Sequence, residues 1–204
     1  TGNLQSKEAY LNLSKKGDYG QASLFVRYFA DDGQTYTGLL DPKVPSTQDP
    51  RSGKEAYFTY TWQDKLRLNA RHLQREVGDF YLLTSLSNGV NHYQTQQDLV
   101  HLHYYFFNTQ QWELSFDGSY LISQEEGLRE LMSAAAIQSL PKTVTGTGPK
   151  VAQVGGNVIE QHSWKLGLDG RYRWTEHHEW LAGLLWQQQV VDKFRTRSNY
   201  DDSA

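Results

Sequence analysis

The chain has 204 residues, a net charge of −3 and no cysteine. The missing thiols exclude disulfide scaffolds, thiolate metal sites and cysteine nucleophiles, and 20 Lys and Arg scattered among 23 Asp and Glu give no basic surface for nucleic acid. Mean hydropathy is −0.70, and no run approaches the roughly 18 consecutive apolar residues of a membrane-spanning helix, which argues against a helical membrane protein.

Apolar and polar residues alternate with a period of two in about eight segments, which predicts an all-β chain. In chain order these segments cover residues 9–14, 21–28, 56–62, 66–71, 100–106, 112–120, 164–174 and 180–187. The fourth is typical, because Leu66 and Leu68 share one face whereas Arg67 and Asn69 share the other. Alternation is weaker in the first two segments and in the last, whose register is ambiguous.

Short and long connections alternate between these segments. Residues typical of tight hairpins occupy 16–19, 63–65, 108–111 and 175–178. The long connections cover residues 30–53, 74–96 and 123–162. All of them fall at one end of the predicted sheet, as in outer-membrane barrels with short periplasmic turns and long extracellular loops. Within the third, Leu128, Leu131 and Met132 lie near helical spacing and predict a short helix in residues 125–138.

Alternation alone does not say which face meets water, since a soluble barrel buries its apolar face and a membrane barrel turns it to lipid. Two features besides the one-sided loops favour the membrane barrel. The polar face is rich in charged side chains suited to ladders inside a lumen, and aromatic residues gather near strand ends, as in an interfacial girdle. These aromatic residues are Trp62, Phe106, Phe107, Trp112, Trp164, Trp174 and Trp180.

We therefore expect an antiparallel transmembrane β-barrel segment of about eight meandering strands. Its lumen-facing polar residues are predicted to be Arg27, Arg67, Arg71, His101, His103, Asp117, Asp169 and Arg171. Most of the cations are expected to pair across strands with Glu113, Asp117 or Asp169. Aromatics and arginine give large contact area at low entropic cost, so the long connections are expected to form a ligand mouth. Its candidates are Tyr36, Arg75, Phe80, Tyr81 and Tyr93.

No catalytic or metal chemistry is predicted. His101 and His103 lie two residues apart and therefore share one face, which could suit a metal ion. No third metal ligand has suitable spacing, so we interpret them as lumen-facing polar residues. The sequence holds no Gly-x-Ser-x-Gly elbow and no strand-to-helix phosphate loop. The glutamates at 125, 126 and 130 are interpreted as a solvated loop surface. We expect a protein that is not an enzyme and that carries no cofactor.

Three stretches resemble the barrel of TonB-dependent outer-membrane receptors. They are SKEAYLNLSKKGDYGQASLFVRYFADDGQTY, LRLNARHLQREVGDFYLLTSLSNGVNHYQTQQDLVHLHYYF and HHEWLAGLLWQQQVVDKFRTRSNY. The resemblance implies a receptor of the bacterial outer membrane that binds and imports a scarce ligand such as a ferric siderophore or cobalamin. Its implied partners are the outer-membrane lipid, a small-molecule or metal-chelate ligand and the TonB complex, which acts through a plug domain.

The chain also departs from the family pattern. It shows no plug domain and no TonB-contacting box, and its last residues, YDDSA, do not form the aromatic end of a closing strand. We therefore expect residues 1–204 to be one segment of a larger barrel. Two alternatives stay open. One is a small closed outer-membrane barrel with an adhesive or structural role, since about eight strands suffice for closure. The other is a soluble β-barrel carrier of apolar ligands.

Overall fold

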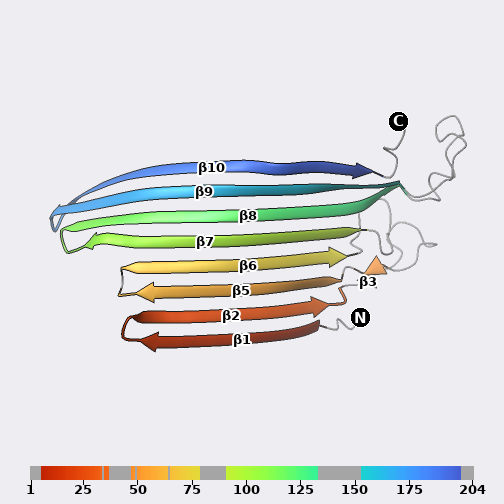
Figure 1. Cartoon of the computed structure of the whole chain (residues 1–204), viewed down its shortest axis with the longest axis horizontal. Coiled ribbons are helices and arrows are strands. Elements are labelled where there is room, and N and C mark those ends of the chain that lie inside the picture. The colour runs from red at the N-terminus through yellow and green to blue at the C-terminus, as the bar shows by residue number, and fades with distance from the viewer. Residues whose placement is uncertain are drawn as a thin grey trace, which may run out of the picture.

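The alternating segments form one antiparallel sheet in a computed structural model of the chain, which describes residues 6–33, 35–36, 47–48, 50–63, 65–78, 91–132 and 153–198. Eight strands lie side by side as a meander, in the order β1-β2-β5-β6-β7-β8-β9-β10 (Figure 1). Their bounds are β1 Ser6–Gly17, β2 Gly20–Asp31, β5 Arg51–Trp62, β6 Leu66–Gly78, β7 His92–Asn108, β8 Trp112–Met132, β9 Gln153–Thr175 and β10 His178–Ser198. A separate ribbon pairs β3, Thr35–Tyr36, with β4, Thr47–Gln48.

The four predicted short turns are confirmed, and they join β1 to β2, β5 to β6, β7 to β8 and β9 to β10. Gly20 shows why the first needs glycine. Its φ is 154°, and a Cβ at this position would lie 2.1 Å from the carbonyl oxygen of Thr61 on β5, so a larger residue would push β2 away from β5. In the next turn Gln63 takes a φ of 45°, and the amide of Lys65 donates to the carbonyl of Trp62 at 2.9 Å.

The strands reach farther into the long connections than predicted, and the predicted helix is wrong. Residues 125–132 extend β8 as a strand, while 133–138 lie outside the described residues. The reason is that β8 has a partner on both sides here. Glu125 pairs with Thr95 on β7 and with Ile159 on β9, so sheet hydrogen bonds satisfy its backbone, whereas a short isolated helix is only marginally stable. Likewise β6 continues to Gly78 and β9 begins at Gln153.

The register gathers most apolar residues of neighbouring strands on one face, because residues directly opposite each other in an antiparallel sheet project to the same side. On β10 the apolar residues lie on both faces, since Leu181 and Leu185 pair with Arg171 and Gly167 on the other side. One row across the strands is Leu13, Leu24, Phe58, Ala70, Val100, Tyr120, Trp164 and Gln188. The next row toward the short turns is Lys15, Ala22, Tyr60, Leu68, Leu102, Gly118, Leu166 and Trp186. The polar members of these rows, Gln188 and Lys15, lie on the two edge strands. We call this side the apolar face and the opposite side the polar face.

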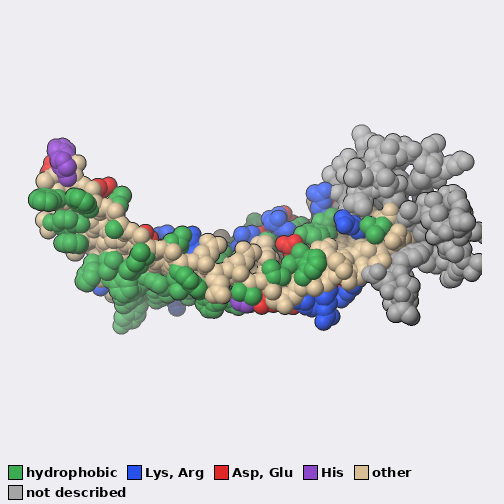
Figure 2. All heavy atoms as spheres, turned by 90° about the horizontal axis from the view of Figure 1, so that it is seen from above, with side chains coloured by type: hydrophobic (Ala, Val, Ile, Leu, Met, Phe, Trp, Pro, Cys, Tyr) green, Lys and Arg blue, Asp and Glu red, His purple; other side chains and the backbone are tan. Residues whose placement is uncertain are grey.

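The apolar face changes character along the strands. On the half nearer the short turns it forms an apolar band, which ends at the row that holds Val26, Ala56, Ile122 and Val190. The same row already holds His72, Asp98 and His162 on β6, β7 and β9, and from there on this face carries a polar belt of ion pairs. These pairs are His72 with Asp98, His162 with Asp192, Glu160 with Lys193 and Glu126 with Arg197. Figure 2 shows hydrophobic side chains gathered over the turn-side half and basic side chains toward the other half.

Neither face of the sheet is covered by another layer in the described part of the chain. The buried hydrophobic residues there are Leu73 and Val158, at 6% and 8% exposure. By contrast, Leu184 on β10 is 75% exposed and Trp180 is 67% exposed. The edge strands β1 and β10 each pair with one neighbour, so the sheet is open (Figure 1). Among the residues that the structure describes, no helix is long and apolar enough to cross a membrane.

Aromatic residues lie at both borders of the apolar band. At the turn-side border, Trp112 on β8 packs against Tyr172 on β9 with ring centroids 4.2 Å apart. Trp164, predicted to lie near a strand end, instead lies within β9, because that strand extends back to Gln153. Its ring packs against Tyr120 with centroids 4.1 Å apart. Trp164 therefore marks the border between the apolar band and the polar belt.

Candidate functional site

The polar face carries all eight residues that were predicted to face a lumen. Arg27 lies on β2, Arg67 and Arg71 on β6, His101 and His103 on β7, Asp117 on β8, and Asp169 and Arg171 on β9. The register brings three of them into one row, because Arg67 pairs with His103 and His103 pairs with Asp117. Of the others, His101 also contacts Asp117, Arg27 and Arg71 share Glu55 as a partner, and Arg171 contacts Glu113.

The centre of the polar face is a histidine–aspartate cluster made of Asn69, His101, His103 and Asp117. One carboxylate oxygen of Asp117, Oδ1, lies 3.1 Å from His101 Nε2 and 2.9 Å from His103 Nδ1. On the other side of His101, Asn69 Nδ2 lies 3.4 Å from Nδ1. Strands β6, β7 and β8 each contribute to the cluster, so it ties the middle of the sheet together.

The partners of His101 and His103 assign their tautomers. The amide nitrogen of Asn69 is a donor, so Nδ1 of a neutral His101 accepts and Nε2 carries the proton that is donated to Asp117. His103 donates to Asp117 through Nδ1, which leaves its Nε2 as an acceptor when the ring is neutral. That Nε2 is buried and has no hydrogen-bond partner among the residues that the structure describes. The cluster therefore has one unused imidazole nitrogen.

A chain of alternating charges crosses the polar face farther from the short turns. Arg27 lies 3.0 Å from Glu8 and 3.8 Å from Glu55, and Arg71 lies 3.5 Å from the second carboxylate oxygen of Glu55. The Glu55 side chain is only 19% exposed, so it is the most protected member of this chain of charges. The arrangement links β1, β2, β5 and β6 across three strand pairs.

The pairing of cations on this face is only partly as predicted. Arg171 contacts Glu113, as expected. Asp117 is bound by histidines instead of arginine or lysine, because the register sets His103 directly opposite. Asp169 makes no ion pair within the described residues. Glu8 and Glu55, the partners of Arg27, were missed, since a sequence pattern gives the face of a residue but not the register between strands.

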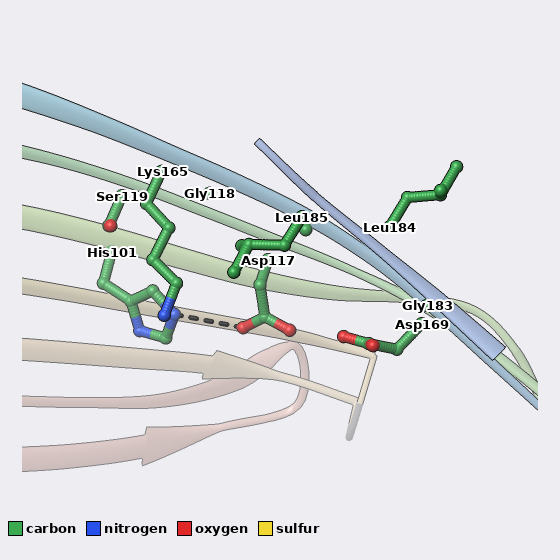
Figure 3. Close-up of a pocket in the computed structure, with 10 residues that line it drawn as sticks. His101, Asp117, Gly118, Ser119, Lys165, Asp169, Gly183, Leu184 and Leu185 are labelled. Atoms are coloured by element: carbon green, nitrogen blue, oxygen red, sulfur yellow. Dashed lines mark hydrogen bonds and ion pairs between the residues drawn. The ribbon is translucent and has the colours of Figure 1, made fainter. Parts of the chain in front are cut away.

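A hollow of about 480 Å³ opens on the polar face beside the cluster (Figure 3). Three glycines, Gly118, Gly167 and Gly183, lie in its wall, and we call it the glycine hollow. A Cβ at Gly183 would come within 2.4 Å of Asp169 Oδ1, so glycine leaves room for this carboxylate. Asp117 and Asp169 project into the hollow, whereas Leu184 points to the opposite side of the sheet (Figure 3).

The candidates for a ligand mouth are only partly placed by the structure. Arg75 on β6 and Tyr93 on β7 both lie on the polar face near the long connections, where Arg75 pairs with Thr95 and Tyr93 with Val77. The hydroxyl of Tyr93 donates to Glu125 Oε2 at 3.3 Å. Burial and the nearby Glu125 carboxylate raise the pKa of Tyr93, which keeps its hydroxyl protonated as a donor.

The remaining mouth candidates cannot be located in the same way. Phe80 and Tyr81 lie outside the described residues, and Tyr36 is described only as part of the β3 backbone. In the part of the chain that the structure describes, no group of three or more His, Asp or Glu is arranged to hold a metal ion. A comparison with protein-family models, with curated proteins and with solved structures finds no match to this chain.

Proposed function

We propose that this chain is a wall segment of the β-barrel of a TonB-dependent receptor in the bacterial outer membrane. The receptor would bind and import a scarce ligand, such as a ferric siderophore or cobalamin. The observation that carries this proposal is the apolar band, which runs in register across the sheet and has no protein layer over it in the described part of the chain. A contiguous apolar surface of this kind is not stable against water and needs lipid or a partner to cover it.

The length of the apolar band supports a lipid environment. A barrel strand crosses the hydrocarbon core with about 9–11 residues. On β8 the band covers residues 112–122 and on β10 it covers residues 180–190. The polar belt then begins on the same face, which fits a strand that leaves the hydrocarbon on the side of the long connections. Aromatic residues at both borders fit the girdles of transmembrane barrels.

The polar face suits the wall of an aqueous passage. Its histidine–aspartate cluster and its alternating charges satisfy one another across strands, and its hollows leave room for water or ligand. Long connections on the outer side, with Arg75 and Tyr93 at their bases, would capture the ligand. A plug domain and the TonB complex would then open the passage. The mechanism is binding and gating without covalent chemistry.

The open edges favour a large barrel over a small closed one. Within a bilayer every backbone amide and carbonyl needs a partner, so the outer edges of β1 and β10 cannot stay unpaired in lipid. Along its length β10, His178–Ser198, extends well beyond β1, Ser6–Gly17. A direct pairing of the two would leave much of β10 without a partner. Further strands on both sides are therefore part of the proposal.

Cell fractionation of the full-length protein tests this function. The protein is expected in the outer-membrane fraction, to need detergent for extraction and to migrate differently on gels before and after heating. Uptake of its ligand should stop when the TonB protein is deleted. A protein that stays in solution without detergent would favour a soluble carrier. Membrane insertion with uptake that does not depend on TonB would favour a simpler outer-membrane barrel.

A further inference from the structure

A second hollow, of about 420 Å³, lies on the polar face between β5, β6 and β7, on the side of the short turns. Its wall includes Lys65, Arg67, Asn69, His101, His103 and Tyr105. We call it the cationic hollow, because none of the described residues in its wall is acidic. Its volume lies within the roughly 300–1,000 Å³ of small-molecule sites.

The two permanent cations of this hollow have no acidic partner among the described residues. Lys65 and Arg67 form no ion pair with any described residue, whereas Arg27, Arg71 and Arg171 on the same face all do. Arg67 lies directly between Thr61 on β5 and His103 on β7, so its side chain projects from the polar face at the middle of the hollow. Two unpaired cations beside each other repel and favour an anion that neutralises both.

Neutral hydrogen-bonding groups complete the wall. Asn69 adds a side-chain amide, and His103 also lies in this wall, although its Nε2 is buried and has no hydrogen-bond partner among the described residues. Tyr105, whose ring contacts His103 edge-on with centroids 4.4 Å apart, adds a hydroxyl. Asp117, on β8, binds both imidazoles from the far side of β7 and is not part of the wall, so its carboxylate does not occupy the hollow.

We propose that the cationic hollow binds a multivalent oxyanion, with Arg67 as its main contact and Lys65 as its second. The planar guanidinium of Arg67 can hold a carboxylate or phosphate group through two hydrogen bonds, and the ammonium of Lys65 adds a point charge. This inference deepens the proposed function. It rests on that function because it requires the polar face to meet water. It places an anion site in the passage, on the side away from the long connections.

Binding of inorganic pyrophosphate to the full-length protein in detergent, measured by titration calorimetry, tests this site. The variant Arg67→Gln should weaken binding about tenfold, because it loses a charge-assisted pair of hydrogen bonds. Lys65→Gln should weaken it by about threefold, since an exposed point charge contributes less. The matched control is Arg195→Gln on the opposite face, which also removes one arginine without an ion pair among the described residues, and should change binding less than about twofold.

The outcomes separate this inference from the proposed function. A variant Arg67→Gln that binds as well as Arg195→Gln would overturn the anion site, as would a wild-type protein that is inserted in membranes but does not bind pyrophosphate. A protein that binds pyrophosphate through Arg67 yet dissolves without detergent would overturn the membrane barrel and leave the site intact. Circular dichroism of each variant shows whether the sheet is retained, so a folding defect is not mistaken for lost binding.

Discussion

The two halves of the apolar face have the same backbone and opposite chemistry. In the apolar band, side chains such as Leu68 and Leu102 face each other across strands, and no described protein layer covers them. In the polar belt, the same strands continue with ion pairs such as His72 Nδ1 to Asp98 Oδ1 at 2.6 Å. One continuous face thus changes from apolar to ionic side chains along the same strands. The difference teaches that the length of a strand and the length of its apolar stretch are set separately, and under the proposed function only the apolar stretch would meet lipid.

Strand β10 shows how the change is built. Up to Val190 its even-numbered residues lie on the apolar face. The register shifts between Val191 and Lys193, so that Lys193, Arg195 and Arg197 lie on that face instead. A β-bulge of this kind adds one residue and re-aims the side chains that follow it. The bulge therefore replaces an apolar edge by a cationic one within a few residues.

The largest expected effect comes from placing a charge in the apolar band. In a bilayer, Leu184→Arg should lower the free energy of unfolding by about 2–4 kcal/mol, because the guanidinium would face hydrocarbon. The control Gln187→Arg lies on the same strand and the polar face, and should change it by less than about 0.5 kcal/mol. Denaturant titrations in vesicles measure both. Equal effects would contradict the contrast between the faces, since Leu184 is 75% exposed and loses little packing within the chain itself.

A smaller effect is expected in the histidine–aspartate cluster. Asp117→Ala removes the acceptor of both His101 and His103, and should cost about 1–2 kcal/mol of unfolding free energy, reduced from the full value because Asp117 is 35% exposed. Asp169→Ala is the matched control, since Asp169 makes no ion pair within the described residues. Its expected cost is below about 0.5 kcal/mol. The same denaturant titrations apply, and a larger cost for Asp169→Ala would refute the assigned hydrogen bonds.

The ion pairs of the polar belt should contribute less. Glu160→Gln breaks the contact with Lys193, which joins Nζ to Oε1 at 2.5 Å on a half-buried surface. We expect a cost of about 0.2–1 kcal/mol that shrinks as salt is raised, because water screens an exposed pair. Comparing the variant with the wild type at low and high NaCl measures this. A cost that does not depend on salt would indicate that the belt is shielded from water, contrary to the proposed place of the belt outside the hydrocarbon.

The smallest effect is a pH dependence in the polar belt. Burial raises the pKa of Asp98, but hydrogen bonds from His72 and Gln96 and the charge of His72 outweigh it, so this pKa is lowered. A carboxyl group whose pKa is lowered by folding stabilises the folded state at pH values above its pKa in the unfolded chain, which is near 3.9. This stability is lost as the pH falls through the pKa of the folded state. Solvent screening keeps it below about 1 kcal/mol. Asp98→Asn should therefore flatten the loss of stability below about pH 4, and an unchanged pH profile would contradict the pair.

The sequence pattern predicted the strands and their faces better than their ends. Period-two alternation fixes which side a residue takes, so Leu66, Leu68 and Arg67 were assigned to the correct faces from the sequence alone. Residues 124–130 carry a single apolar side chain, Leu128, so no alternation marks them as a strand. There the pattern predicted a helix, and pairing with two neighbouring strands decided otherwise.

The candidate site followed the same division. The pattern identified four polar-face residues, because their neighbours in the sequence belong to the apolar face. These residues are Arg67, His101, His103 and Asp117. Their contacts depend on the register between strands, which turn geometry and bulges set and composition does not. For that reason three features could be seen only once the strands were paired. They are the hydrogen bonds of Asp117 to two histidines, the charges around Arg27 and the lack of an ion pair between Arg67 and any described residue.

Site-directed labelling of β6 probes the orientation of the sheet most directly, and the absence of cysteine from this chain makes single-cysteine variants simple to interpret. Spin labels at positions 66 to 71 of the full-length protein in vesicles would be compared for collisions with oxygen, which is concentrated in lipid, and with a water-soluble nickel complex. We predict that labels at 66, 68 and 70 meet oxygen and that labels at 67, 69 and 71 meet nickel. The reverse alternation, or none, would contradict a barrel wall between hydrocarbon and water.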